Sequence, residues 1–209
     1  DYKRAVIIGS KQTYGKGTVQ NVYDLNRWLR QNDLGDMGAL KITTQKFYRI
    51  NGGSTQLEGV KSDVVVPDRF SYIDIGEKDL DNPLPWDKIA AADYEVWDGY
   101  IDYDQTISNS NERMAKNKQL QLIEENAKWI KSKQDDSVWP LNIDAYAAKM
   151  EQNEAEAKRF DDLRNYESGL TFKSLPYEIK KFENDTVLKQ KRERWHEDLA
   201  KDVYMDEAI

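Results

Sequence analysis

The spacing of the apolar residues changes part-way along this chain, and that change limits the fold more than any other feature. Residues 39–50 are rich in β-branched and aromatic side chains, which is typical of a long β-strand. Beyond about residue 108, apolar residues recur at steps of three and four, at Leu120, Ile123, Ala127 and Ile130. That spacing is typical of an amphipathic helix. The sequence therefore predicts an α+β chain that is β-rich at its beginning and helical at its end.

Several shorter patterns surround the predicted strand. The apolar run Ala5–Ile8 ends at a glycine and predicts a buried strand. Residues 27–38 are polar and contain glycine, which favours a surface loop. Asn51–Ser54 predicts a turn, because its two glycines tolerate positive φ. Val64–Val66 predicts a short buried strand.

The helical part is divided by breaks. Ser108 or Asn109 can cap the first helix, whose apolar stripe ends near residue 135. A second charged helix follows to about Tyr166, and the pair predicts an antiparallel hairpin. A final helix is expected within residues 178–202. Ahead of the helices, residues 68–107 are acidic and rich in turns, and their aromatic side chains favour anchorage of an irregular segment on a neighbouring core.

A lysine between two glycines follows the first predicted strand, in the segment Gly15-Lys16-Gly17-Thr18-Val19-Gln20. If this segment is extended, residues two apart lie on one face. Lys16, Thr18 and Gln20 then point the same way. The pattern predicts an amine and an amide side by side on one surface, with a hydroxyl between them.

Two chemistries use a lysine in this setting. A phosphate-binding P-loop requires four residues between its glycines, a Ser or Thr after the lysine and then a helix. Here five residues separate Gly9 from Gly15, Gly17 follows the lysine, and VQNVYDL has the pattern of a strand. The other chemistry is that of a Ser-Lys hydrolase, in which a neutral lysine takes the proton of a serine nucleophile. An ordinary lysine is protonated at neutral pH, so this role requires desolvation.

Blocks along the whole chain resemble one protease family. The first block is Asp1-Tyr2-x-Arg4-Ala5 with the Gly-Lys-Gly segment, and the second runs from ITTQKFYRINGGSTQ to GVKSD. These resemble the carboxy-terminal processing, or tail-specific, proteases of the S41 serine peptidase family. DNPLPWD and the terminal YMDEA resemble the longer, tail-specific branch. The resemblance implies that residues 1–75 are the C-terminal part of a crotonase-like S41 catalytic domain. Residues 76–209 would be the helical C-terminal domain of a tail-specific protease.

The resemblance also implies roles for three residues. Lys16 matches the general base of the family, Gln20 matches a glutamine that orients this lysine, and Asp1 matches an aspartate near the site. The family's nucleophilic serine and its PDZ module are expected upstream of Asp1. The chain is therefore expected to be a C-terminal fragment, inactive alone, of a longer protease that we call the parent. By the same resemblance, the parent is a serine-type endopeptidase of the bacterial periplasm, and its substrates are proteins or peptides recognised near their C-termini.

Composition excludes several other classes of function. A net charge of -7 argues against nucleic-acid binding through phosphate contacts. No apolar run approaches the length that spans a bilayer. With no cysteine and one histidine, the chain cannot build a thiolate zinc site or a histidine cluster, and no metal or cofactor is expected. His196 lies in a charged helical stretch, which favours a solvated surface histidine over a triad member.

A non-catalytic alternative remains open from the residues alone. The helical part has the pattern of a scaffold or of a domain on which an adaptor protein docks. Without the family resemblance, Lys16 has the pattern of a surface lysine on a glycine-rich turn. The two hypotheses are distinguished by the parent's sequence, which carries the upstream serine only if the protein is an enzyme.

Overall fold

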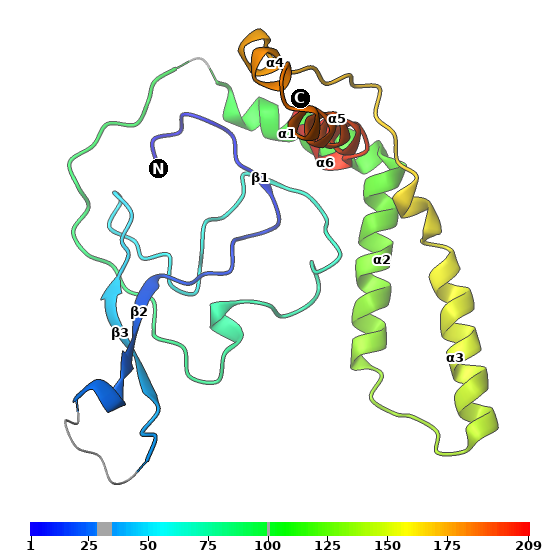
Figure 1. Ribbon diagram of the computed structural model, residues 1–209, viewed down its shortest axis with the longest axis horizontal. Coiled ribbons are helices and arrows are strands. Elements are labelled where there is room, and N and C mark those ends of the chain that lie inside the picture. The colour runs from blue at the N-terminus through cyan, green and yellow to red at the C-terminus, as the bar shows by residue number, and fades with distance from the viewer. Residues whose placement is uncertain (29–34, 100) are drawn as a thin grey trace. The chain divides into compact units, whose positions relative to one another are not determined.

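The computed structural model describes residues 1–28, 35–99 and 101–209. The chain divides into two compact units. The first contains Asp1–Ile7, Lys11–Asp63 and Asp74–Ile101. The second contains Ile8–Ser10, Val64–Ile73 and Asp102–Ile209. The longer strands belong to the first unit and the α-helices to the second (Figure 1).

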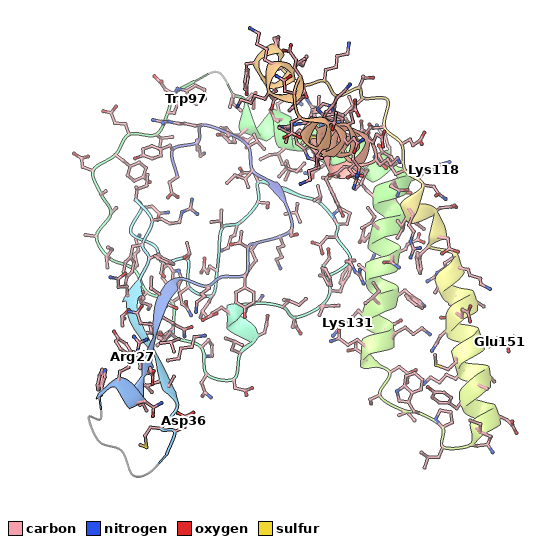
Figure 2. The ribbon with its side chains drawn as sticks, viewed as in Figure 1. Arg27, Asp36, Trp97, Lys118, Lys131 and Glu151 are labelled. Atoms are coloured by element: carbon pink, nitrogen blue, oxygen red, sulfur yellow. The ribbon has the colours of Figure 1, made fainter. Side chains whose placement is uncertain are left out.

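The first unit is built around an antiparallel ribbon. β2 (Thr18–Asp24) pairs with β3 (Ala39–Lys46) along their whole length, and Arg27 and Asp36 lie near the tip of this ribbon (Figure 2). The register shifts between Val19 and Gln20, whose partners are Gln45 and Thr43, so β3 has one extra residue there. Such a bulge bends the ribbon locally.

The strand, turn and loop predicted next to this ribbon agree only partly with the structure. The long strand predicted over residues 39–50 is confirmed as far as Lys46. Beyond it, the Gly52 N–H donates to the Arg49 carbonyl at 2.8 Å, and Gly52 has a φ of +82°. The turn predicted there is therefore confirmed. Of the loop predicted over residues 27–38, residues 29–34 lie outside the described residues, and a 3-10 helix, η1 (Leu25–Trp28), leads into it.

Two short strands pair in the second unit. β1 (Ile8–Gly9) lies parallel to β4 (Val64–Val65), with Ile8 opposite Val64. Val64 and Val66 are buried, as predicted. The prediction of a buried strand over Ala5–Ile8 is wrong, because only Ile8 joins a strand and Ile7 is 41% exposed. Among the described residues, β1 has a single strand partner, and a two-stranded sheet covers little of either strand.

The acidic segment of the first unit is irregular apart from a 3-10 helix, η2 (Glu77–Asp79). Two of its aromatic residues contact other segments of the first unit, but the core predicted beneath them is not found among the described residues, since Trp86 and Tyr2 are 39% and 40% exposed. The Trp86 indole N–H donates to the Ser54 carbonyl at 2.9 Å. The ring of Tyr94 packs edge-to-face against Tyr2, with 5.7 Å between the ring centroids.

The second unit contains the helices α1 (Tyr103–Lys116), α2 (Lys118–Asp135), α3 (Ile143–Lys158), α4 (Pro176–Phe182), α5 (Thr186–Ala200) and α6 (Val203–Ala208), with a 3-10 helix η3 (Asp161–Arg164) after α3. The cap predicted at Ser108 or Asn109 for the first of these helices is wrong, because both residues lie inside α1. The side chain of Asp102 caps α1, and that of Asn117 caps α2. Asn117 is extended, at φ −81° and ψ 109°, which ends one helix and starts the next.

The predicted antiparallel hairpin is confirmed for α2 and α3, which run side by side (Figure 1). Figure 2 shows Lys118 and Lys131 along α2 and Glu151 on α3. Lys133 of α2 donates to Asn153 of α3 at 2.8 Å. The rings of Trp129 and Phe160 pack with 5.6 Å between centroids. The apolar stripe predicted on α2 lies on the buried face of that helix, since Leu120 and Ala127 are 2% and 0% exposed.

Glu156 of α3 gives this hairpin a pH-dependent stability. Its carboxylate accepts hydrogen bonds from Lys133 at 2.8 Å, from Trp129 Nε1 at 3.0 Å and from Gln152 Nε2 at 3.0 Å. These bonds, that of Lys133 first, lower the pKa of Glu156 from 4.5 to about 2. Because the folded-state pKa is depressed, the contribution to stability is fully present above pH 4.5 and is lost as the pH falls through about 2.

We therefore expect Glu156→Gln to lower the melting temperature at neutral pH and to match the wild type near pH 2. Thermal unfolding followed by circular dichroism across this pH range is the measurement. Glu151→Gln, at an exposed position of the same helix, is the matched control. Equal melting temperatures of the wild type and Glu156→Gln at neutral pH would contradict the expectation.

The last helix, α6, is hydrogen-bonded to α1 through a buried carboxylate. Glu207 of α6 accepts hydrogen bonds from Ser110 and Arg113, each at 2.6 Å. The Tyr204 hydroxyl donates to the Pro67 carbonyl at 2.8 Å.

The chain is a mixed α and β structure, with few strands and a helical C-terminal part, as predicted. Among the described residues, no helix combines the length and the apolar character needed to cross a membrane.

Candidate active site

The Gly-Lys-Gly segment lies in the loop that leads into β2. Lys16 is exposed, whereas Gly15 and Gly17 are buried. Gly15 has a φ of +88°, and a Cβ atom there would come within 2.8 Å of the Leu57 carbonyl oxygen. A Cβ atom at Gly17 would come within 2.3 Å of the backbone nitrogen of Gln56. Close packing therefore requires both glycines, and Lys16 sits on a tightly packed loop.

The structure brings Lys16 and Gln20 together. Lys16 Nζ donates a hydrogen bond to Gln20 Oε1 at 3.0 Å, and both residues are exposed. Thr18, which was expected on the same face, is instead buried, with 4% of its surface exposed. β2 begins only at Thr18, so the Lys16 side chain reaches Gln20 from the preceding loop. The amine and the amide lie side by side on the surface, without the hydroxyl expected between them.

Asp1 lies against a different part of the first unit. Its carboxylate accepts a hydrogen bond from Arg49 Nε at 2.9 Å and another from Asn51 Nδ2 at 3.2 Å. The side chain of Asp1 is 13% exposed. Among the described residues, no hydrogen bond or ion pair joins it to Lys16 or Gln20. The structure therefore groups two of the three predicted site residues and separates the third from them.

A charged cluster lies beside the end of β3. Lys46 Nζ donates to Asp87 Oδ1 at 2.9 Å and to the Pro85 carbonyl at 2.9 Å. The Tyr48 hydroxyl donates to Asp87 Oδ2 at 3.0 Å. The Lys46 ammonium holds the pKa of Asp87 below its ordinary value, and burial together with Asp87 raises the pKa of Tyr48. The cluster tethers residues 85–87 to the ribbon.

A buried amide next to the lysine loop was not predicted from the sequence. Gln56 is 0% exposed, and its Oε1 accepts a hydrogen bond from the Gly17 N–H at 2.9 Å. Its Nε2 donates to Glu77 Oε1 at 3.2 Å and to the Leu84 carbonyl at 3.1 Å. Gln56 and Gly17 are 39 residues apart, and no local pattern distinguishes this glutamine from the others in the chain.

His196 of α5 is the other residue considered for a nucleophilic site. It was expected to be solvated, but it is half-buried, with Nε2 3.4 Å from Ser174 Oγ. That distance exceeds the usual range for a hydrogen bond between a hydroxyl and a ring nitrogen. Among the described residues no carboxylate contacts the ring, so the third member of a triad is lacking there.

The arrangement at Lys16 is suited to proton transfer. An amine whose direction is held by an amide oxygen can act as a general base once it is neutral. Among the described residues the amine is bonded to Gln20, and no serine hydroxyl contacts it. These residues leave Lys16 exposed, so they do not supply the desolvation that a neutral lysine requires.

Two family models match the chain over nearly its whole length. A model described as peptidase family S41 matches residues 1–66. A model described as the C-terminal domain of tail specific protease matches residues 70–209. The chain belongs to the tail-specific protease family. The family predicted from the sequence blocks is therefore confirmed.

Two relatives of this tail-specific protease chain have corresponding names. The chain is similar to the tail-specific protease of Haemophilus influenzae, with 40% identity over 167 residues that cover 78% of this chain and 24% of the relative. It is also similar to the carboxy-terminal-processing protease of Bartonella bacilliformis, with 37% identity over 86 residues that cover 38% of this chain and 18% of the relative. The chain spans about a quarter of the length of the Haemophilus relative.

Proposed function

We propose that this chain is part of a serine endopeptidase that cleaves proteins near their C-termini. The observation that carries the proposal is the hydrogen bond of 3.0 Å between Lys16 Nζ and Gln20 Oε1, in a chain of the tail-specific protease family. Lys16 is the general base, and Gln20 orients it. Residues 1–75 form the last part of a crotonase-like catalytic domain, and residues 76–209 form the helical C-terminal domain.

In this mechanism the parent supplies the nucleophilic serine from sequence upstream of Asp1. The neutral amine of Lys16 takes the proton of the serine hydroxyl as the serine oxygen attacks the peptide carbonyl. The lysine then gives this proton to the departing amine, and an acyl-enzyme remains. Water hydrolyses the acyl-enzyme with the help of the same base. Gln20 accepts one N–H of Lys16, which directs the nitrogen lone pair, and the rest of the catalytic domain desolvates the amine.

Asp1 has a supporting role in the proposal. Its bonds to Arg49 and Asn51 join the first residue of the chain to the turn after β3. Because no hydrogen bond or ion pair joins it to Lys16 or Gln20 among the described residues, we assign it no part in proton transfer. Its function is to hold the segment that begins at residue 1 against the turn after β3.

We also propose the substrates of the parent, its compartment and a protein partner. The substrates are proteins or peptides, as the names of the two relatives suggest for those proteins, and the compartment is the periplasm. The helical domain also offers a surface for an adaptor protein. Around the connection from α2 to α3, Val138, Leu141 and Ile143 are 76%, 103% and 75% exposed. An apolar group of this kind favours a docking role in addition to catalysis.

The experiment is proteolysis of an unstructured protein substrate by the full-length parent and by this 209-residue chain. We expect the parent to degrade the substrate and the chain alone to be inactive, because a base without its nucleophile forms no acyl-enzyme. An active relative serves as the control for the assay. An inactive parent would favour the scaffold function, and an active isolated chain would place the nucleophile within these residues.

A further inference from the structure

The side chain of Gln56 is fixed by bonds on both ends of its amide. Its single oxygen accepts from the Gly17 N–H, and its nitrogen donates to Glu77 and to the Leu84 carbonyl. The two N–H donors and the acceptor of the amide are therefore all in use. Rotating the amide by half a turn would place its NH₂ group against the Gly17 N–H. In a fully buried site such a mismatch is costly, so the amide has one orientation.

The group that Gln56 holds is the peptide directly after Lys16. The Gly17 N–H belongs to the peptide that joins Lys16 to Gly17. On the other side of Lys16, the Gly15 carbonyl accepts a hydrogen bond from the Leu57 N–H at 2.7 Å. The peptide planes on both sides of the Lys16 Cα are thus held by two consecutive residues. Since peptide groups are planar, this fixes the direction in which the lysine side chain leaves the backbone.

We propose that Gln56 is a positioning residue for Lys16 and acts through the Gly17 amide. The inference rests on the proposed function, in which Lys16 is the general base. Gln56 does not touch the amine itself. It holds the backbone from which Lys16 Nζ reaches Gln20 Oε1 at 3.0 Å. Glu77, which is 8% exposed, holds the far side of the Gln56 amide and so keeps its oxygen on Gly17.

A purely stabilising role for Gln56 makes a different prediction. A lost buried hydrogen bond lowers the stability of the protein, but it leaves the folded molecules fully active. A positioning role lowers kcat of the folded enzyme, because a displacement of about 1 Å in a catalytic group costs on the order of 10²-fold in rate. KM changes little, since groups that bind substrate stay in place.

The test uses variants of the full-length parent, each assayed at a temperature at which circular dichroism shows it folded. Gln56→Met keeps the length of the side chain and removes its hydrogen bonds, and we expect a loss of about 10²-fold in kcat with KM within about threefold. Gln56→Asn keeps an amide but is one methylene shorter. It should show the same loss, and it replaces Gln56→Met if that variant does not fold.

A double variant, Gln56→Glu with Glu77→Gln, tests whether an oxygen at position 56 restores the activity that is lost in Gln56→Met. It keeps an oxygen for the Gly17 N–H and reverses donor and acceptor between the two side chains, although the Leu84 carbonyl loses its donor. We expect it to recover most of the kcat lost in Gln56→Met. A folded Gln56→Met variant with wild-type kcat, or a double exchange as slow as Gln56→Met, would overturn the positioning role.

Lys16→Ala, assayed beside these variants, separates the two proposals. If Lys16→Ala is inactive and Gln56→Met retains wild-type kcat, only the positioning role fails. If Lys16→Ala retains full activity, the proposed function fails and the positioning role fails with it.

Discussion

Replacing Lys16 with alanine in the parent protease is expected to lower kcat/KM by roughly 10³- to 10⁶-fold while the protein stays folded. Among the described residues the Lys16 side chain makes one hydrogen bond, to Gln20. The loss of a single hydrogen bond costs about 1 kcal/mol, so the protein should stay folded. What is lost is the group that takes the serine proton. Steady-state cleavage of a peptide substrate gives the rate, and thermal unfolding checks the fold.

Two further variants control this prediction. Lys16→Arg keeps the positive charge, but a guanidinium remains protonated and cannot act as a base, so we expect the same loss. Lys11→Ala removes an exposed lysine five residues earlier and should leave the rate unchanged. Wild-type rates in Lys16→Arg would show that this position contributes only charge.

Replacing Gly17 with alanine in the parent is expected to lower both stability and the rate of cleavage. The new Cβ atom would lie 2.3 Å from the backbone nitrogen of Gln56 and 2.8 Å from its Cα, so one of the two backbones must move. Overpacking of this kind costs about 1–3 kcal/mol of stability. A shift of about 1 Å at the lysine loop would cost on the order of 10²-fold in kcat. Peptide cleavage and thermal unfolding of the parent variant measure the two effects.

Gly169→Ala is the matched control, because a Cβ atom at Gly169 meets nothing within 4 Å. We expect this variant to keep both its activity and its melting temperature. If Gly17→Ala behaved in the same way, the close packing of the lysine loop against residue 56 would not matter for catalysis.

Elements with strong local patterns could be predicted from the sequence. The alternation over residues 39–50 located β3, and the stripe through Leu120 and Ala127 located α2 and its buried face. Lys16 and Gln20 lie together as expected, but the strand alternation behind that expectation is wrong, because β2 begins only at Thr18 and Thr18 is buried. For β3 and α2 the signal lies within a few residues, so propensity and periodicity are enough.

Features that depend on distant contacts could not be predicted. The apolar run at Ala5–Ile8 is mostly uncovered, because burial depends on which strands lie next to it and the run itself carries no such information. Asp102 and Asn117 cap helices in a region with many other Asp, Asn and Ser residues, so composition could not select them. The burial of Gln56 depends on a contact with Gly17 that is 39 residues distant.

If the amine of Lys16 acts as the base, replacing it by a weaker amine should change the pH dependence of cleavage. The test begins with a Lys16→Cys parent in which any other cysteine has been replaced; this chain contains none. Alkylation with 2-bromoethylamine then gives a side chain of nearly the same length, with a sulfur in place of one methylene, and a less basic amine.

We expect the Lys16→Cys parent to be inactive and alkylation to restore cleavage. The acidic limb of the profile of kcat/KM against pH should move to lower pH, because the restored base is weaker. No recovery in a protein that mass spectrometry shows to be fully alkylated, or recovery with an unshifted profile, would contradict the claim that Lys16 is the general base.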